Sequence, residues 1–291
     1  MKLMTKFNLI LLVLFGSGGL IIALVAYNFL ISNARREVLR EAQLMMSSAR
    51  AIRDYTANDV APLLLDTPKY KSTFLPEVVP AFSALTSFDE LKQDYPDYSY
   101  REATLNPTNP DHKAVDWEAD VINHLRDHPE LKQVTGERQT TSGPSLYLAM
   151  PIAAQRPCLE CHSTPAAAPA SMIAKYGTKH GFGWKQGTII AAQIISVPMS
   201  LPVEIANQAF HRLLLYLAII MIATIAALDA GVYFIVIRPL QRMSEAADRI
   251  SKGEKDLPPL PAKGSDEIAA VTKAFNRMQV SLAKAFKMLE S

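Results

Sequence analysis

The chain has 291 residues, a formal net charge of +2, and a hydrophobic share of 49%. A charge this close to neutral gives no electrostatic support for nucleic-acid binding, so no nucleic acid is expected as a partner. The sequence contains neither a nucleophile beside a paired base nor a glycine-rich phosphate loop, so we do not expect an enzyme.

The first predicted element is a membrane span over residues 7–31, which follows a short N-terminus of residues 1–6. The run contains no charged residue, and it exceeds the roughly 20 residues that cross a bilayer. Lys2 and Lys6 precede it and Ser32-Asn33-Ala34 follows it, so a cleaved signal peptide is the alternative. Because the apolar run is longer than a typical signal core, we interpret it as an uncleaved anchor.

Residues 32–212 are long enough for one ordinary domain. A helix is expected to continue from the first span to about Leu65, ending or restarting at Pro62. Its apolar residues share one face at helical spacing: Val38, Ala42, Met45, Ala49, Ile52 and Thr56. A second helix is predicted over residues 117–128, and strands are predicted over residues 145–150 and 187–199.

Both cysteines of the chain lie in Cys158-Leu159-Glu160-Cys161-His162. This is the attachment pattern of a haem c, in which each thiol adds to one vinyl group and the adjacent imidazole binds the iron. Pro157 before the motif and Ser163-Thr164-Pro165 after it predict a loop with at most a short helical turn. The sequence therefore predicts one covalent haem on Cys158 and Cys161, with His162 as an axial ligand.

Three other interpretations of the cysteines stay open from the sequence. A redox dithiol has the same spacing, although it does not need the histidine and usually opens a helix beside a strand. His124 and His128 would complete a Cys2His2 zinc set, although they precede the cysteines and lie far from them in sequence. A disulfide is the third interpretation, and a bridge across two residues constrains little chain.

A second membrane span is predicted over residues 213–237, where Asp229 is the one charged residue. An acid is costly in lipid, so Asp229 is expected to face a neighbouring helix or a hydrated crevice. Lys2 and Lys6 before the first span, and Arg238 and Arg242 after the second, place both termini in the cytoplasm.

Arg35, Arg36 and Arg40 favour the opposite orientation, but a domain-sized segment translocates largely regardless of its charge. Covalent haem is attached on the outer face of bacterial membranes, which decides between the two orientations. We therefore expect a multi-pass protein of the bacterial inner membrane with a periplasmic main domain.

Residues 238–291 are expected to form two amphipathic helices joined by a proline-rich connector, residues 257–261. The first helix carries Leu240, Met243, Ala247 and Ile250 and stops at Lys252-Gly253-Glu254. The second begins at Asp266-Glu267-Ile268, with Ser265 or Asp266 as its N-cap. Its apolar residues follow heptad spacing: Ile268, Val271, Phe275, Met278, Leu282, Ala285 and Leu289.

This layout resembles a HAMP signalling domain, and the specific features are Pro239, Asp266-Glu267-Ile268 and Phe275-Asn276-x-Met278. The resemblance implies a parallel four-helix bundle built from two chains, and hence a homodimer. It also implies that Leu257 and Leu260 of the connector pack against the bundle.

Four segments resemble a family of membrane-tethered, single-haem c-type sensor domains of cyanobacteria and proteobacteria: residues 51–56, 100–110, 158–162 and 176–184. The resemblance implies a PAS-like fold with one haem, often fused to HAMP and kinase or receptor modules. The expected fold class is therefore α+β. Two transmembrane helices flank a PAS-like extracytoplasmic haem domain, and a two-helix HAMP coiled-coil segment follows.

In some members of this family a cysteine on the leading helix binds the iron opposite the histidine, and this chain has no third cysteine. Met45 or Met46 is one candidate for that second axial ligand. A histidine (His124, His128 or His180) is another candidate, and an open iron site is the third.

Other contacts of the cofactor are suggested by residue type. Arg50 and Arg53 lie on the leading helix and have the forked donor geometry that suits a haem propionate, although each is equally expected in solvent. Tyr55 and Trp184 are expected either to contact the porphyrin or to fill the core.

Two functions are compatible with the sequence. In the first, the haem senses a redox change or a small gas in the periplasm and passes the signal to a cytoplasmic HAMP bundle and a separate signalling protein. In the second, the chain is a membrane-anchored electron-transfer cytochrome with a periplasmic redox partner. We favour the sensor because an electron carrier does not need a signalling bundle. A dimeric scaffold that uses haem only for folding is a third and weaker interpretation.

Overall fold

The computed structural model describes residues 3–254 and 257–289. The chain forms two compact units, one of residues 26–210 and one of the residues before and after that range. Lys2, which we used for the orientation, lies outside the described residues. So do residues 290–291 of the predicted HAMP segment, and the side chain of Leu289 is not described either.

Helix α1 (Leu3–Tyr55) supplies the first unit with its residues from 26 onward. A single π-helical turn, Thr56–Val60, joins it to the short helix α2 (Ala61–Leu65). The helix therefore restarts beside Pro62, as the sequence predicts, because proline is tolerated in the first turn of a helix. Helix α3 (Pro68–Ser72), a 3-10 turn at Pro76–Val78 and helix α4 (Pro80–Asp94) follow.

Four antiparallel strands form one sheet in the order β1-β4-β3-β2. Their bounds are β1 (Ser99–Thr104), β2 (Val134–Thr140), β3 (Gly143–Ala153) and β4 (Ile189–Pro198). Strands β2 and β3 form a hairpin, whereas β4 lies between β1 and β3. Both of the strands predicted from the sequence are thus present, and β4 is buried along nearly its whole length, as expected for a central apolar strand.

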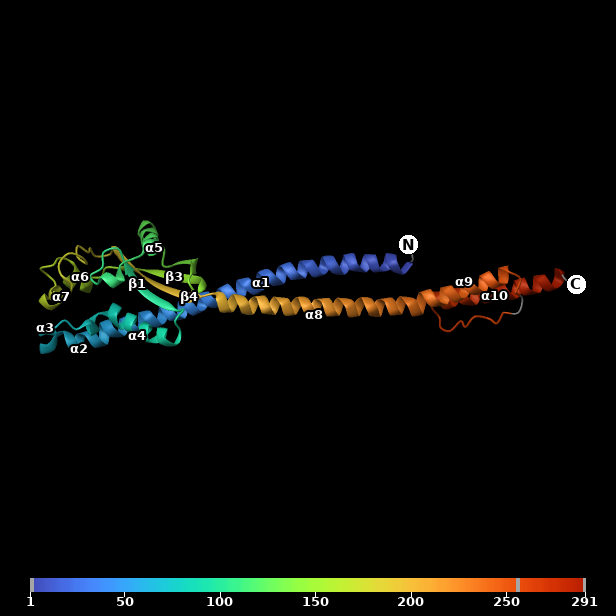
Figure 1. The fold of residues 1–291 in the computed structure, drawn as a ribbon, viewed down its shortest axis with the longest axis horizontal. Helices are drawn as coiled ribbons and strands as arrows, with labels where there is room; N and C mark the ends of the chain where they lie inside the picture. Colours follow the sequence, from blue (N-terminus) through green and yellow to red (C-terminus); the bar gives the residue numbers. More distant parts are fainter. Residues whose placement is uncertain (1–2, 255–256, 290–291) are drawn as a thin grey trace. The chain divides into compact units, whose positions relative to one another are not determined.

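Helices cover both faces of this sheet (Figure 1). Helices α1 and α4 pack on one face, where Ala84 and Phe88 meet Tyr100 and Ile195. Helix α5 (Asp116–Asp127) packs on the other face, where Ile122 and the side chains near it are fully buried. The cysteine motif lies in the connection between β3 and β4, together with helices α6 (Arg156–His162) and α7 (Ala170–Tyr176).

Two predictions about local structure are wrong in detail. The cysteine motif is a helix of seven residues, α6, and not a loop, because Pro157 occupies the first turn and tolerates the missing donor there. On α1, Met46 is the buried residue at 2% exposure, whereas Met45 is only partly buried. Steps of three and four residues both keep a side chain on one helical face, and packing against the sheet selects Met46.

The predicted membrane spans lie mostly in the second unit, which contains residues 7–25 of the first span and all of the second span, residues 213–237. The helical stretches Met4–Leu65 and Ser200–Ser251 are long and apolar enough to cross a membrane. The second stretch consists of α8 (Ser200–Val232), a π-helical segment (Tyr233–Ile237) and α9 (Arg238–Ser251). Large apolar side chains on these runs are exposed, as lipid-facing residues are: Leu12, Val13, Ile222 and Ile235 among them.

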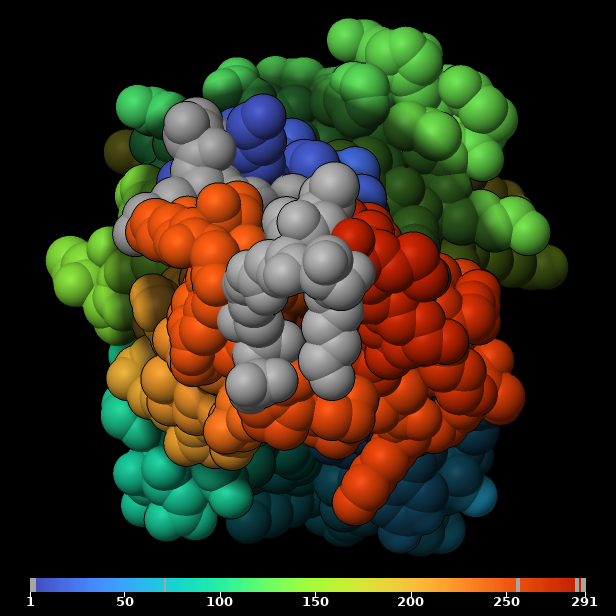
Figure 2. Space-filling model, turned by 90° about the vertical axis from the view of Figure 1, so that its right-hand side faces the viewer, coloured from blue at the N-terminus to red at the C-terminus, as the bar shows by residue number. Residues whose placement is uncertain are grey.

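The C-terminal helices are joined as the sequence predicts. Helix α9 ends before Gly253, whose φ of 95° suits a glycine. Helix α10 (Glu267–Leu289) is capped by Asp266, whose carboxylate accepts a hydrogen bond from the Ala269 amide at 2.7 Å. Figure 2 shows the orange and red atoms of this region next to one another.

The connector between these helices lies along α10. The side chain of Asn276 donates to the Leu260 carbonyl at 2.9 Å and accepts from the Leu260 amide at 3.0 Å. Gln279 donates to the carbonyl of Leu257 at 2.6 Å. Leu257 and Leu260 are both half-buried, which agrees with the packing expected of them.

Candidate haem-attachment site

Helix α6 presents the two cysteines on one face, because residues three apart are neighbours on a helix surface. Both thiols are free and half-buried. Burial raises the pKa of the Cys161 thiol, and the nearby Glu160 and Cys158 raise it further. A redox dithiol needs a lowered thiol pKa, so this environment argues against that interpretation of the motif.

His162 lies in the last turn of α6 and is held by one strong hydrogen bond. Its Nδ1 lies 2.7 Å from the carbonyl oxygen of Gly181, and since a carbonyl only accepts, Nδ1 carries the proton. Burial lowers the pKa of His162, while the bond to Gly181 opposes that shift. The neutral ring therefore keeps the Nε2 lone pair free, which is the arrangement of a metal-binding histidine with a fixed tautomer.

Two loops that are distant in sequence meet at this histidine. Asn106, in the loop after β1, accepts a hydrogen bond from the Gly181 amide at 3.2 Å and donates to the Phe182 carbonyl at 3.4 Å. Thr108 Oγ1 lies 3.4 Å from Nδ1 of His162. The loop after β1 thus positions the loop that holds the imidazole.

Gly181 is required by this close approach. Its φ is +83°, and a Cβ atom added there would lie 2.0 Å from Thr108 Oγ1 and 2.9 Å from Thr108 Cα. Gly181, Asn106 and Thr108 were not predicted individually as site residues, although they lie within the resemblance segments of residues 100–110 and 176–184. The available signals were the turn-forming Asn-Pro-Thr stretch after β1 and the run of glycines before Trp184.

Trp184 supports the histidine and also packs against the small core cluster of Ala154, Ile190 and Ala191. Its ring stacks on the His162 ring, with centroids 4.0 Å apart and planes 15° apart. Its amide donates to the His162 carbonyl at 3.2 Å, and the Gly183 amide donates to the Ser163 carbonyl at 3.1 Å. If His162 binds a haem iron, this stacking would hold its imidazole in a fixed orientation.

The residues present fit a covalent haem. Two free thiols share a helix face. The imidazole next to the second thiol is held by the protein through its Nδ1, and its Nε2 remains free to bind a metal. Helix α3 lies near the same place. Burial raises the pKa of Tyr70 on this helix, and the nearby charges of Cys161 and Glu160 raise it further. Phe74, just after α3, contacts Tyr176 of α7 with ring centroids 6.0 Å apart.

Met45 and Met46 both pack in the core cluster with Tyr100, Leu148 and Ile195. The contacts described for His162 are with Gly181, Thr108 and Trp184. An axial thioether from α1 therefore stays a prediction.

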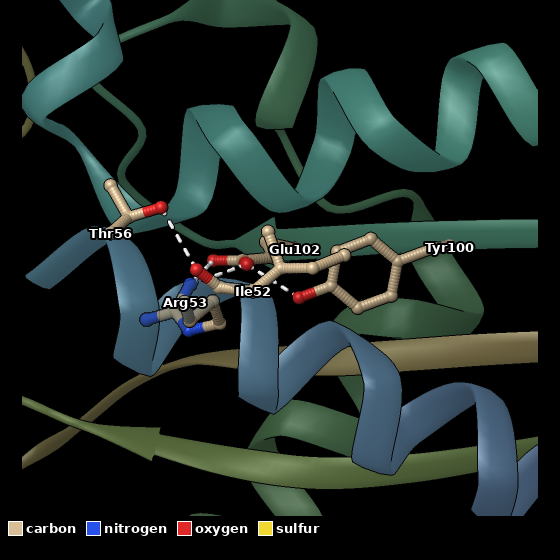
Figure 3. A network of polar contacts seen from close by, with 5 residues as sticks. All are labelled: Ile52, Arg53, Thr56, Tyr100 and Glu102. Carbon is tan, nitrogen blue, oxygen red and sulfur yellow. Dashed lines mark hydrogen bonds and ion pairs between the residues drawn. The ribbon is translucent and has the colours of Figure 1, made fainter. Parts of the chain in front are cut away.

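Arg53 is already engaged by a carboxylate of the protein (Figure 3). Its guanidinium forms an ion pair with Glu102 of β1, and the two side chains are 21% and 6% exposed. A propionate role for Arg53 would therefore compete with a buried internal partner. Arg50 is exposed and Tyr55 is 63% exposed, so both are accessible, but neither is packed beside α6 in the contacts described.

The Arg53–Glu102 pair is part of a wider network that joins α1 to the sheet. The Tyr100 hydroxyl donates to Glu102 at 2.5 Å. Burial raises the pKa of Tyr100, and the negative charge of Glu102 adds to this. Burial alone would lower the pKa of Arg53, but the charge and hydrogen bond of Glu102 outweigh it and raise the pKa. The Arg53 guanidinium therefore stays charged at neutral pH.

The other histidines considered as ligands lie at two places. His124 lies on α5 and His128 directly follows that helix, and their rings contact each other with centroids 4.5 Å apart. His180 is exposed and directly precedes Gly181 in the loop that holds His162, so its role as a ligand stays a prediction. Within the described part of the chain, no three His, Cys, Asp or Glu side chains gather as a metal-binding group, so a Cys2His2 zinc site has no geometric support.

Trp184 also lines a cavity of about 550 Å³, together with Asn106, Arg126 and Phe182. The thiols and the imidazole of the motif do not line this cavity. The cavity therefore lies beside the loop that holds His162, but the cysteine helix does not line it.

Two family models match parts of this chain. Residues 31–198 match the Tll0287-like family, and residues 234–284 match the HAMP domain family. The crystal structure of the cyanobacterial haem protein Tll0287 aligns with 15% sequence identity and a TM-score of 0.44, covering 56% of this chain and 95% of that one.

Curated relatives match only a part of the chain. The histidine-protein kinase/phosphatase MprB of Mycobacterium tuberculosis is 37% identical over 84 residues, which is 29% of this chain and 16% of MprB. MprB of Mycolicibacterium smegmatis is 47% identical over 49 residues, which is 17% of this chain and 10% of that protein. The chain thus spans about a sixth or less of the length of these relatives.

The family match covers more than half of the chain and includes the cysteine helix, both loops around His162 and the four strands. The chain combines helices with a sheet, and two of its helical stretches are able to cross a membrane. The HAMP match, residues 234–284, begins within the second of these stretches. The chain therefore belongs to the Tll0287-like family of haem-binding sensor domains, and a HAMP domain follows the family domain in its sequence.

Proposed function

We propose that the chain carries one covalent haem c, attached through Cys158 and Cys161, with His162 as an axial ligand. The observation that carries this proposal is the hydrogen bond from His162 Nδ1 to the Gly181 carbonyl, at 2.7 Å. It fixes the ring with Nε2 free, directly after a helix that presents two free thiols on one face. The bound haem would supply one-electron chemistry and a site for a small gas.

We further propose that the chain is a sensor that passes a redox or gas signal from the haem to the HAMP domain. Strand β4 supports one route, because it begins five residues after Trp184 and ends at Pro198, two residues before α8. The Arg53–Glu102 pair supports a second route, because it ties α1 to β1, which pairs with β4. A movement at His162 would reach both helices that lead to the membrane.

The proposed location is the bacterial inner membrane, with the haem domain in the periplasm and both termini in the cytoplasm. We propose a homodimer through the HAMP helices, because apolar side chains remain exposed on them, such as Leu240 at 42%, Val271 at 49% and Met278 at 48%. A separate cytoplasmic protein would receive the signal, and the chain itself would not be an enzyme.

Haem attachment is tested on the full chain produced with a cytochrome-maturation system. We expect haem staining on a denaturing gel for the native protein and for His162→Ala, and none for the double variant Cys158→Ala/Cys161→Ala. His162→Ala should also change the visible spectrum, since it removes the axial ligand and leaves both thioethers. A native protein without covalently held pigment on the gel would refute the proposal.

Signal transmission is tested by a single reporter cysteine in the HAMP helices. The chain has two cysteines, both committed to haem in this proposal, so Met278→Cys is a unique exposed thiol. We expect a bis-maleimide to cross-link two chains to different extents in the ferric and ferrous states. A yield that is the same in both states would favour the alternative, an electron-transfer cytochrome with a periplasmic partner.

A further inference from the structure

The second unit contains a polar contact between its two apolar helices. Asn8 belongs to the apolar run of α1, and Asp229 belongs to the apolar run of α8. The Asn8 side-chain amide donates to Asp229 Oδ2 at 3.0 Å, and both residues are half-buried. The sequence predicted that Asp229 faces either a neighbouring helix or a hydrated crevice. In the structure it faces the other predicted span.

One oxygen on each of these side chains lacks a donor. Asn8 Oδ1 and Asp229 Oδ1 are both buried by protein atoms, and neither has a hydrogen-bond partner among the described residues. The ion pairs found within residues 3–254 and 257–289 also do not include Asp229. Buried polar oxygens without partners are rare in proteins, so this pair needs an explanation.

A single proton on Asp229 would satisfy both oxygens. A carboxylate has only acceptors, so the ionised form leaves two buried acceptors without a donor, and a charge without a cation. A neutral carboxylic acid has one O–H donor, which can point from Asp229 Oδ1 to Asn8 Oδ1. The acid and the amide then form a closed ring of two hydrogen bonds, each group donating once and accepting once.

We propose that Asp229 holds a proton and that Asn8 and Asp229 form this neutral two-bond pair, which ties the two membrane-spanning helices together. The pair introduces no net charge into the membrane and satisfies every polar atom of both side chains that lies between the helices. It fixes the axial register of one span against the other. This proposal concerns the second unit, which contains Asn8 and Asp229, and does not depend on haem being bound.

The test is infrared difference spectroscopy on the full chain in lipid nanodiscs at neutral pH, with the haem kept in one redox state. We expect the spectrum of the native protein minus that of Asp229→Asn to contain the C=O stretching band of a protonated carboxylic acid. That band should shift to lower frequency in D2O. Carboxyl groups elsewhere in the chain cancel in the difference.

Two variants keep the result decisive. Asp229→Asn still allows two hydrogen bonds between amides, so it should fold, and the chain's tryptophan fluorescence checks the sheet domain. The exchange variant Asn8→Asp/Asp229→Asn places the same pair the other way round, so it should restore the acid band. If the difference spectra contain only the stretching bands of an ionised carboxylate, the proposal is refuted.

Discussion

Gly181 offers a sharp test of how the site is built, because a single methyl group is expected to separate the two loops around His162. An added Cβ would lie 2.0 Å from Thr108 Oγ1 and 2.9 Å from Thr108 Cα, and the second atom is backbone that cannot rotate away. In Gly181→Ala, the loop after β1 or the loop before Trp184 must move. The hydrogen bond between the Gly181 carbonyl and His162 is then lost or lengthened.

The matched control is Gly177→Ala. Gly177 has a φ of +78°, close to the +83° of Gly181, but a Cβ there meets no atom within 4 Å. The cost of alanine at positive φ is shared by both variants and cancels in the comparison. What remains for Gly181→Ala is about 1 to 3 kcal/mol of overpacking and about 1 kcal/mol for the hydrogen bond.

The assay is thermal unfolding of the full chain in detergent, followed by tryptophan fluorescence. Both tryptophans, Trp117 and Trp184, lie in the unit of residues 26–210, so the signal reports that unit. A difference of about 2 to 4 kcal/mol corresponds to a Tm about 4 to 16 °C lower for Gly181→Ala than for Gly177→Ala. Equal Tm values for the two variants would show that the loops do not approach as closely as described.

Three further predictions use the same chain. Glu102→Gln should lower the free energy of unfolding by about 2 to 4 kcal/mol, because it leaves the largely buried Arg53 without a partner. Glu137→Gln should lower it by only about 0 to 1 kcal/mol, because its ion pair with Arg35 is exposed. The Tm of each variant measures the loss. Burial lowers the pKa of His112, against the opposing charges of Glu102 and Asp111. As pH falls below about 6.5, the unfolded chain therefore binds a proton at His112 before the folded chain does, and the folded state loses stability. The decrease of Tm from about pH 7.5 to about pH 5.5 should be smaller in His112→Gln than in the native protein. An equal decrease in both proteins would contradict this role of His112. Asn276→Ala removes two hydrogen bonds to Leu260, so trypsin should cleave at Lys263 about 5- to 30-fold faster, while Gln279→Ala, which removes one bond, should have a smaller effect.

The sequence predicts well what depends on local chemistry. Cys158, Cys161 and His162 are close together in the chain, so the prediction of a shared role for them needs only their spacing. The restart of the helix at Pro62 and the cap at Asp266 also follow from neighbouring residues. The partners of His162 do not, because Asn106 and Gly181 are 75 residues apart and meet only when β1 and β4 pair. Their role requires the sheet topology.

The residues of the leading helix show why a one-dimensional pattern was insufficient for the second half of the site. Helical spacing correctly placed the stripe of α1 against the sheet, but it did not fix how far along the sheet each residue lies. The structure supplies that axial position and places Met46 in the core cluster with Tyr100 and Ile195. It also places Arg53 beside Glu102 of β1, where the ion pair holds α1 to the sheet. In the proposed function, Arg53 would therefore answer a change at the haem by moving α1 together with β1.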